Sequence, residues 1–174
     1  MDAQTIHLWL RLTARVSFLF FLGAFVAAAL FRLWPSPATG WLAAKRDRSI
    51  LGFAASHTVH LSFIAVLAIK LGSTEFLRQI GWVPLVVGGT VYLFIYGLAA
   101  AAAFPNSVKP FRSPRFQAFA LYLIWTIFAL GFVSRAVRSA FYLPFALAVM
   151  AALALRFLAA KEARKIAALS TASH

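Results

Sequence analysis

Residues 83–104 read VPLVVGGTVYLFIYGLAAAAAF and contain no charged side chain. At about 1.5 Å per residue in a helix, a stretch of this length matches the roughly 30 Å hydrocarbon core of a bilayer. It lacks the strict alternation of apolar and polar residues that is typical of membrane β-strands. This stretch therefore predicts a membrane-spanning α-helix.

Four further segments are apolar over a similar length, so the whole chain is predicted to be an all-α integral membrane bundle of five transmembrane helices. Backbone groups in lipid must be paired within the protein, which favours helices for such long apolar runs. Ser49 is a predicted N-cap of the second helix. We expect a single domain, 1–174, with a basic tail at 159–174 and spans at 16–33, 50–71, 83–104, 116–133 and 140–158.

The composition excludes a soluble enzyme. Of the 174 residues, 63% are hydrophobic and 12% are charged, whereas soluble domains carry about 25% charged residues. The absence of cysteine excludes disulfides and thiolate metal sites. The chain has 17 Lys and Arg against 4 Asp and Glu. Because the cations lie between apolar runs, we interpret them as topology signals that also attract the lipid bilayer, and we expect no nucleic-acid partner.

The distribution of cations predicts an orientation in the cell membrane. Of the 17 cations, eleven lie in the first and third connections and in the tail. The other six lie in the N-terminal segment and in the second and fourth connections: Arg11, Arg15, Lys70, Arg78, Arg135 and Arg138. The richer side is expected in the cytoplasm, which places the N-terminus outside and the C-terminus inside.

The four carboxylates, Asp2, Asp47, Glu75 and Glu162, all lie outside the predicted spans. A transporter that relays protons or sodium through buried acids is therefore disfavoured. Hydrolysis by paired carboxylates and carboxylate-bridged metal sites are disfavoured for the same reason. The remaining candidates for chemistry are two histidines in the second span.

His57 and His60 are predicted about 10 Å and 15 Å along the helix from Ile50, close to the middle of the bilayer. A spacing of three places both imidazoles on one helix face. An imidazole at this depth needs a partner. One interpretation is axial ligation of a haem iron. The other is hydrogen bonding between helices to a tyrosine, a glutamine or a backbone carbonyl.

The spacing also limits the haem interpretation. Two histidines on one face of one helix do not reach opposite sides of one haem, so at most one is an axial ligand. His7 is expected to precede the first helix and His174 is the last residue, while Met150 is the methionine within a span. The aromatic donors predicted inside spans either reach the histidines or simply pack between helices: Tyr92, Tyr96, Tyr122 and Trp125.

Residues 45–66, KRDRSILGFAASHTVHLSFIAV, resemble a core helix of the ferric reductase-like transmembrane domain family. This family includes haem-binding membrane subunits of methionine sulfoxide reductase systems. The family pattern has basic residues, then Leu-Gly, then an apolar helix with a haem-ligating histidine two to three turns in. Residues 115–137, RFQAFALYLIWTIFALGFVSRAV, resemble a later helix of the same family, in which Gln117 stands where the family has a histidine.

The resemblance implies haem b, held by His57 or His60, in a subunit that passes electrons between a redox partner and an acceptor. The basic connections would then face that partner or another membrane subunit. The departure at Gln117 supports a different hypothesis, in which the bundle has lost haem and serves as a non-catalytic scaffold or assembly subunit.

Overall fold

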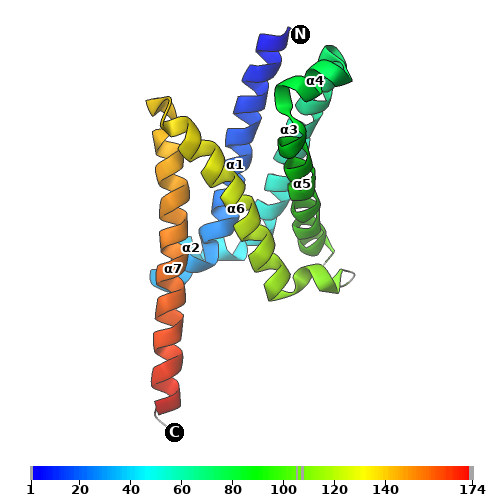
Figure 1. The fold of residues 1–174 in the computed structure, drawn as a ribbon. Helices are drawn as coiled ribbons and strands as arrows, with labels where there is room; N and C mark the ends of the chain where they lie inside the picture. The colour runs from blue at the N-terminus through cyan, green and yellow to red at the C-terminus, as the bar shows by residue number, and fades with distance from the viewer. Residues whose placement is uncertain (1, 105, 107, 173–174) are drawn as a thin grey trace. The chain divides into compact units, whose positions relative to one another are not determined.

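The computed structural model describes residues 2–104, 106 and 108–172, and over these residues it is helical without strands. The all-α prediction is therefore confirmed. Figure 1 shows the helices in chain order, from blue to red. They are α1 Ala3–Leu33, α2 Pro37–Ala44, α3 Arg46–Leu71, α4 Ser73–Ile80, α5 Trp82–Ala103, the 3-10 helix η1 Lys109–Arg112, α6 Pro114–Ala136, the 3-10 helix η2 Ala140–Tyr142, and α7 Leu143–Ala172.

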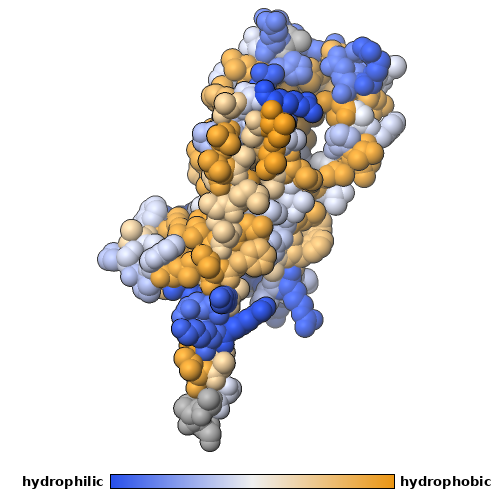
Figure 2. Space-filling view, turned by 60° about the vertical axis from the view of Figure 1, so that its left-hand side comes forward, coloured by the Kyte–Doolittle hydropathy of each residue, from blue (hydrophilic) through white to orange (hydrophobic). Residues whose placement is uncertain are grey.

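Five helices in the described part of the chain are long and apolar enough to cross a membrane: α1, α3, α5, α6 and α7. Many of their large apolar side chains face outward, including Leu93, Leu130 and Leu147, each more than 60% exposed. Figure 2 shows hydrophobic residues over much of the face in view, with hydrophilic residues gathered at the top of the view and again in its lower part. Apolar surface of this extent suits contact with lipid, so these helices indicate a membrane protein.

The first and last long helices extend beyond the predicted spans. Helix α1 begins at Ala3 because Asp2 accepts a hydrogen bond from the Thr5 backbone N–H at 2.7 Å and so caps it. Helix α7 continues to Ala172 through a tail rich in Ala, Lys, Arg and Glu, all strong helix formers. The prediction that Ser49 caps the second helix is wrong, since α3 already begins at Arg46.

Two short α-helices, α2 and α4, lie outside the five predicted spans. Ser36 and Thr39 form a reciprocal capping box at the start of α2. Helix α4 is enclosed by Gly72 and Gly81, whose φ angles of 76° and 81° lie in the left-handed region that favours glycine. Its Phe76 is buried against Ile6 and Leu67.

The chain divides into two compact units, and the divisions pass through α1 and α6. The first unit contains the chain up to Phe21 together with Asp47–Ile124, and the second contains Leu22–Arg46 together with the chain from Trp125 onward. In the first unit Phe21 packs against Phe53, with ring centroids 5.4 Å apart. In the second unit Phe132 stacks on Phe145 at 5.2 Å.

Candidate functional site

His57 and His60 lie on either side of the midpoint of α3, a helix of 26 residues. Their ring centroids are 5.3 Å apart, which confirms that the two imidazoles share one face of the helix. Both side chains are half-buried. They belong to a group that we call the histidine cluster, contributed by three helices of the first unit: Thr13 of α1, Phe53, His57, Thr58 and His60 of α3, and Tyr92 and Tyr96 of α5.

His60 is tied to α1 by a side-chain hydrogen bond. Its Nδ1 lies 2.9 Å from the hydroxyl oxygen of Thr13. The same hydroxyl donates to the backbone carbonyl of Trp9, one turn earlier, at 2.7 Å. The ring of Trp9 stacks on Phe63 of α3 at 5.8 Å with the two planes nearly parallel. Helices α1 and α3 are thus joined by a polar and an aromatic contact at neighbouring turns.

His57 lies among aromatic rings. Its ring centroid is 5.2 Å from that of Phe53 on its own helix and 5.0 Å from that of Tyr92 on α5. The Tyr92 hydroxyl donates to the backbone carbonyl of His57 at 3.1 Å. Since a carbonyl oxygen has two lone pairs, it can accept this bond in addition to its backbone hydrogen bond within α3. Tyr92 therefore contacts both the ring and the backbone of His57.

A second hydroxyl pair joins α3 and α5 next to this contact. Thr58 Oγ1 and Tyr96 Oη are 3.1 Å apart, and the rings of Tyr92 and Tyr96 are 6.1 Å apart. Ser56 and Ser62 instead donate to carbonyls of α3 itself, those of Phe53 and Thr58, as serines in helices often do.

The other candidates from the sequence lie elsewhere. Trp125 belongs to the second unit, where it donates to the carbonyl of Val149 at 2.8 Å. Gln117 donates to the carbonyl of Arg112, just before α6 begins. Met150 is 48% exposed on α7, and Tyr122 is also exposed. His174 lies outside the described residues.

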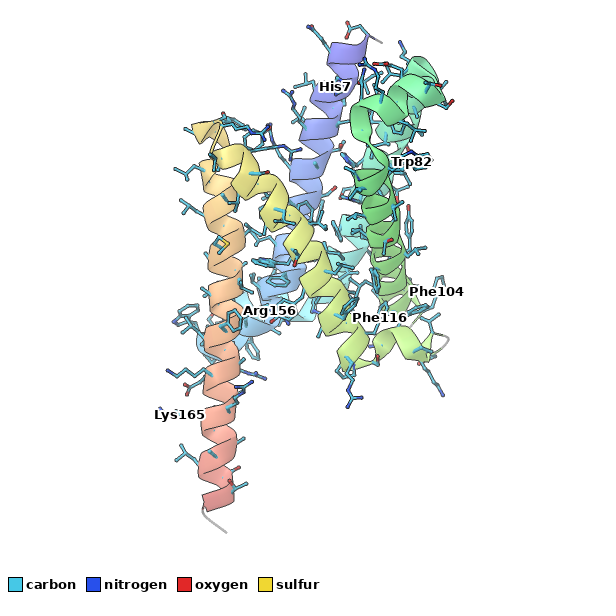
Figure 3. All side chains as sticks on the ribbon, in the orientation of Figure 1. His7, Trp82, Phe104, Phe116, Arg156 and Lys165 are labelled. Atoms are coloured by element: carbon cyan, nitrogen blue, oxygen red, sulfur yellow. The ribbon has the colours of Figure 1, made fainter. Side chains whose placement is uncertain are left out.

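The expectation that His7 precedes the first helix is wrong, because α1 begins at Ala3 and includes it. Figure 3 shows His7 near the N-terminal end of α1, and its side chain is exposed. The same early start of α1 brings Thr13 into the histidine cluster. The sequence alone does not reveal Thr13, because residues 1–15 are of mixed polarity and precede the first predicted span.

Among the described residues there is no group of three or more His, Cys, Asp and Glu side chains that could hold a metal ion. This absence does not address a site that takes only one or two imidazoles from the chain. His57 and His60 are the candidates for such a site. Comparison of the chain with protein-family models, curated proteins and solved structures finds no match. The histidine cluster is therefore the basis on which a function is assigned.

Proposed function

We propose that this protein is a ferric reductase-like membrane subunit that binds haem b through His57 or His60 and takes part in electron transfer. The observation that carries the proposal is the setting of the two imidazoles. They lie at mid-helix in a helix able to cross a membrane, and the rings and hydroxyls of α1 and α5 surround them. Imidazoles that faced only lipid would lack these polar and aromatic neighbours.

The residues of the cluster suit a haem bound through one protein ligand. A neutral imidazole supplies the lone pair that iron requires. Phe53 and Tyr92 offer flat ring surfaces beside His57, and both lie on helices that are long and apolar enough to cross a membrane, whose hydrocarbon core holds no water. When bound, haem supplies one-electron chemistry. The role of the chain is to hold the group, to set the direction of the ligating imidazole and to exclude water.

An absorbance spectrum of the purified protein, oxidised and then reduced with dithionite, tests the proposal together with a pyridine haemochrome assay. We expect a Soret band that disappears in a variant carrying His57→Ala and His60→Ala. His7→Ala is the matched control, because His7 is an exposed histidine of α1 outside the cluster. A colourless protein from haem-replete cells, or a Soret band that survives the double substitution, would contradict haem binding at this site.

A second candidate function is a non-catalytic scaffold, and the contacts between helices favour it. The Thr13–His60 and Thr58–Tyr96 bonds join α3 to both of its neighbours without any added group. In that case the protein is colourless, and His60→Ala lowers its melting temperature in detergent while His7→Ala leaves it unchanged. A Soret band of the wild-type protein, lost in the double variant, would reject the scaffold.

We also propose that the protein lies in the cell membrane with its C-terminal side in the cytoplasm, where the basic connections meet the redox partner. The eleven-to-six distribution of cations supports this orientation. Because the chain has no cysteine, the labelling of single introduced cysteines can reveal which side of the membrane each position faces. A membrane-impermeant maleimide should label Ser139→Cys, but not Lys165→Cys, in intact cells. The reverse pattern would overturn the orientation.

A further inference from the structure

We propose that Thr13 is a positioning residue that holds His60 in the tautomer with the proton on Nδ1, so that Nε2 keeps its lone pair for iron. The role assigned to iron rests on the proposed function. The tautomer itself follows from the hydrogen bonds of α1 and α3 and can be tested without haem.

The argument starts from the single proton of the Thr13 hydroxyl. A threonine hydroxyl has one donor hydrogen and two acceptor lone pairs. The backbone carbonyl of Trp9, 2.7 Å from Thr13 Oγ1, and the carbonyl of Leu10, 3.3 Å away, are both acceptors. The hydroxyl proton is therefore directed toward this turn of α1, and the shorter distance favours Trp9.

The partner of Thr13 on α3 must then be a donor. His60 Nδ1 lies 2.9 Å from Thr13 Oγ1, and with the hydroxyl proton already used, two lone pairs would face each other unless Nδ1 carries a proton. A neutral imidazole has one N–H, so Nε2 of His60 has the free lone pair. Metal-ligating histidines are commonly held in this way, with the second ring nitrogen donating to an oxygen atom.

The neutral form of His60 is supported by the charges of the three helices. An imidazolium at mid-span would need a carboxylate nearby. Helices α1 and α5 contain no Asp or Glu, and Asp47 lies in the first turn of α3. An imidazolium would also have no lone pair to offer.

Thr90 offers a comparison with Thr13, because it is another threonine of the first unit that bonds back to its own helix and it lies outside the histidine cluster. Thr90 of α5 donates to the carbonyl of Val86 at 2.9 Å, as Thr13 does to Trp9, but it is exposed. Thr90→Val therefore removes the same kind of helix bond without touching a histidine and serves as the matched control for Thr13→Val. Thr13→Ser keeps the hydroxyl and is the conservative variant.

The tautomer is measured by ¹⁵N NMR of histidine-labelled protein produced under haem limitation, with the His60 signals assigned from their loss in His60→Ala. The wild-type protein, Thr13→Ser and Thr90→Val should show the proton on Nδ1 of His60. In Thr13→Val the population of this tautomer should fall at least several-fold. A proton on Nε2 in the wild type, or an unchanged population in Thr13→Val, would overturn the proposal.

Haem titration of the same proteins gives the second readout. Loss of the partner that orients a metal ligand typically weakens binding about 10- to 100-fold, so Thr13→Val should bind haem that much more weakly while Thr13→Ser and Thr90→Val match the wild type. Equal haem affinity of Thr13→Val and the wild type would refute the positioning role. If no variant binds haem, the proposed function fails, and the NMR result alone decides the tautomer.

Discussion

The two units of the chain use polar side chains between helices in different ways. In the first unit, two of these contacts join side chain to side chain, between Thr13 and His60 and between Thr58 and Tyr96, and a third runs from the Tyr92 hydroxyl to the His57 carbonyl. In the second unit, long side chains donate to backbone carbonyls. Trp125 donates to Val149, and Arg156 donates to Phe25 at 3.1 Å with its guanidinium 4.5 Å from the Phe25 ring. Figure 3 labels Arg156 on α7.

This difference separates the unit that can carry chemistry from the unit that packs. Indole and guanidinium groups are donors without a usable lone pair, so neither Trp125 nor Arg156 can serve as a ligand of a metal ion. Imidazoles have a lone pair as well as a proton, and a hydrogen bond at one nitrogen leaves the other available. The candidate metal-ligating side chains, His57 and His60, therefore lie in the first unit. Substitutions in each unit can test how strongly its helices are held together.

The largest effect is expected at Gly52 of α3, which lies directly against Phe20 of α1. A Cβ added at Gly52 would lie 2.7 Å from Cδ1 of the Phe20 ring, so Gly52→Leu forces either this ring or the helix backbones to shift. Overpacking of this kind typically costs about 1–3 kcal/mol. The free energy of unfolding, measured in mixed detergent micelles, should fall by about that amount relative to Gly89→Leu.

Gly89 is a suitable control because a Cβ there meets nothing within 4 Å. Both variants gain the same helix propensity over glycine, about 1 kcal/mol, so the difference between them isolates the contact with Phe20. Equal stability of the two variants would mean that the close approach of α1 and α3 does not hold the first unit together.

The sequence was sufficient to predict the class of fold and the paired histidines. Long uncharged runs without alternating polarity form α-helices in lipid. A spacing of three residues puts two side chains on one helix face, so the shared face of His57 and His60 was predicted from their positions alone. The short helix α4 was not predicted, because the burial of its Phe76 depends on a cluster that includes Ile6 of α1, which lies far from it in the sequence.

The partners of the histidines could not be predicted for a related reason. Tyr92 was recognised as a candidate donor, but its hydroxyl reaches the backbone of His57 and not the ring. Thr13 lies in a stretch of mixed polarity and has no sequence pattern that connects it to residue 60. Contacts of this kind depend on the axial register of α1 against α3. The periodicity within each helix does not determine this register.

A smaller effect is expected from Trp125→Phe in the second unit. The substitution removes the bond to the Val149 carbonyl, but this carbonyl lies within α7 and keeps its helical partner, so no buried group is left unpaired. Single hydrogen bonds between membrane helices are worth about 0.6 kcal/mol on average. We expect a loss of stability of about that size and an unchanged Soret band. A Soret band that changes would show that the second unit contributes to the site.

The smallest effect is expected at the exposed end of the first unit, on α4. Arg78 donates to both carboxylate oxygens of Glu75, at 2.6 Å and 2.7 Å, and Gln79 donates to one of them at 2.7 Å. These bonds, with those of Arg78 the larger, lower the pKa of Glu75 below its ordinary value of 4.5. Because the folded pKa is depressed, the stabilisation is complete above the ordinary pKa and is lost as the pH falls through the folded value.

Arg78→Gln should therefore raise the pKa of Glu75 toward 4.5, with little change in stability because the pair is exposed. The chain has two glutamates, Glu75 and Glu162, which lie in different units, so carboxyl ¹³C labelling of glutamate gives two signals to follow against pH. The Glu75 signal should titrate at a higher pH in the variant than in the wild type. A Glu75 signal that titrates at the same pH in both proteins would mean that the bonds from Arg78 do not lower the pKa of this carboxylate.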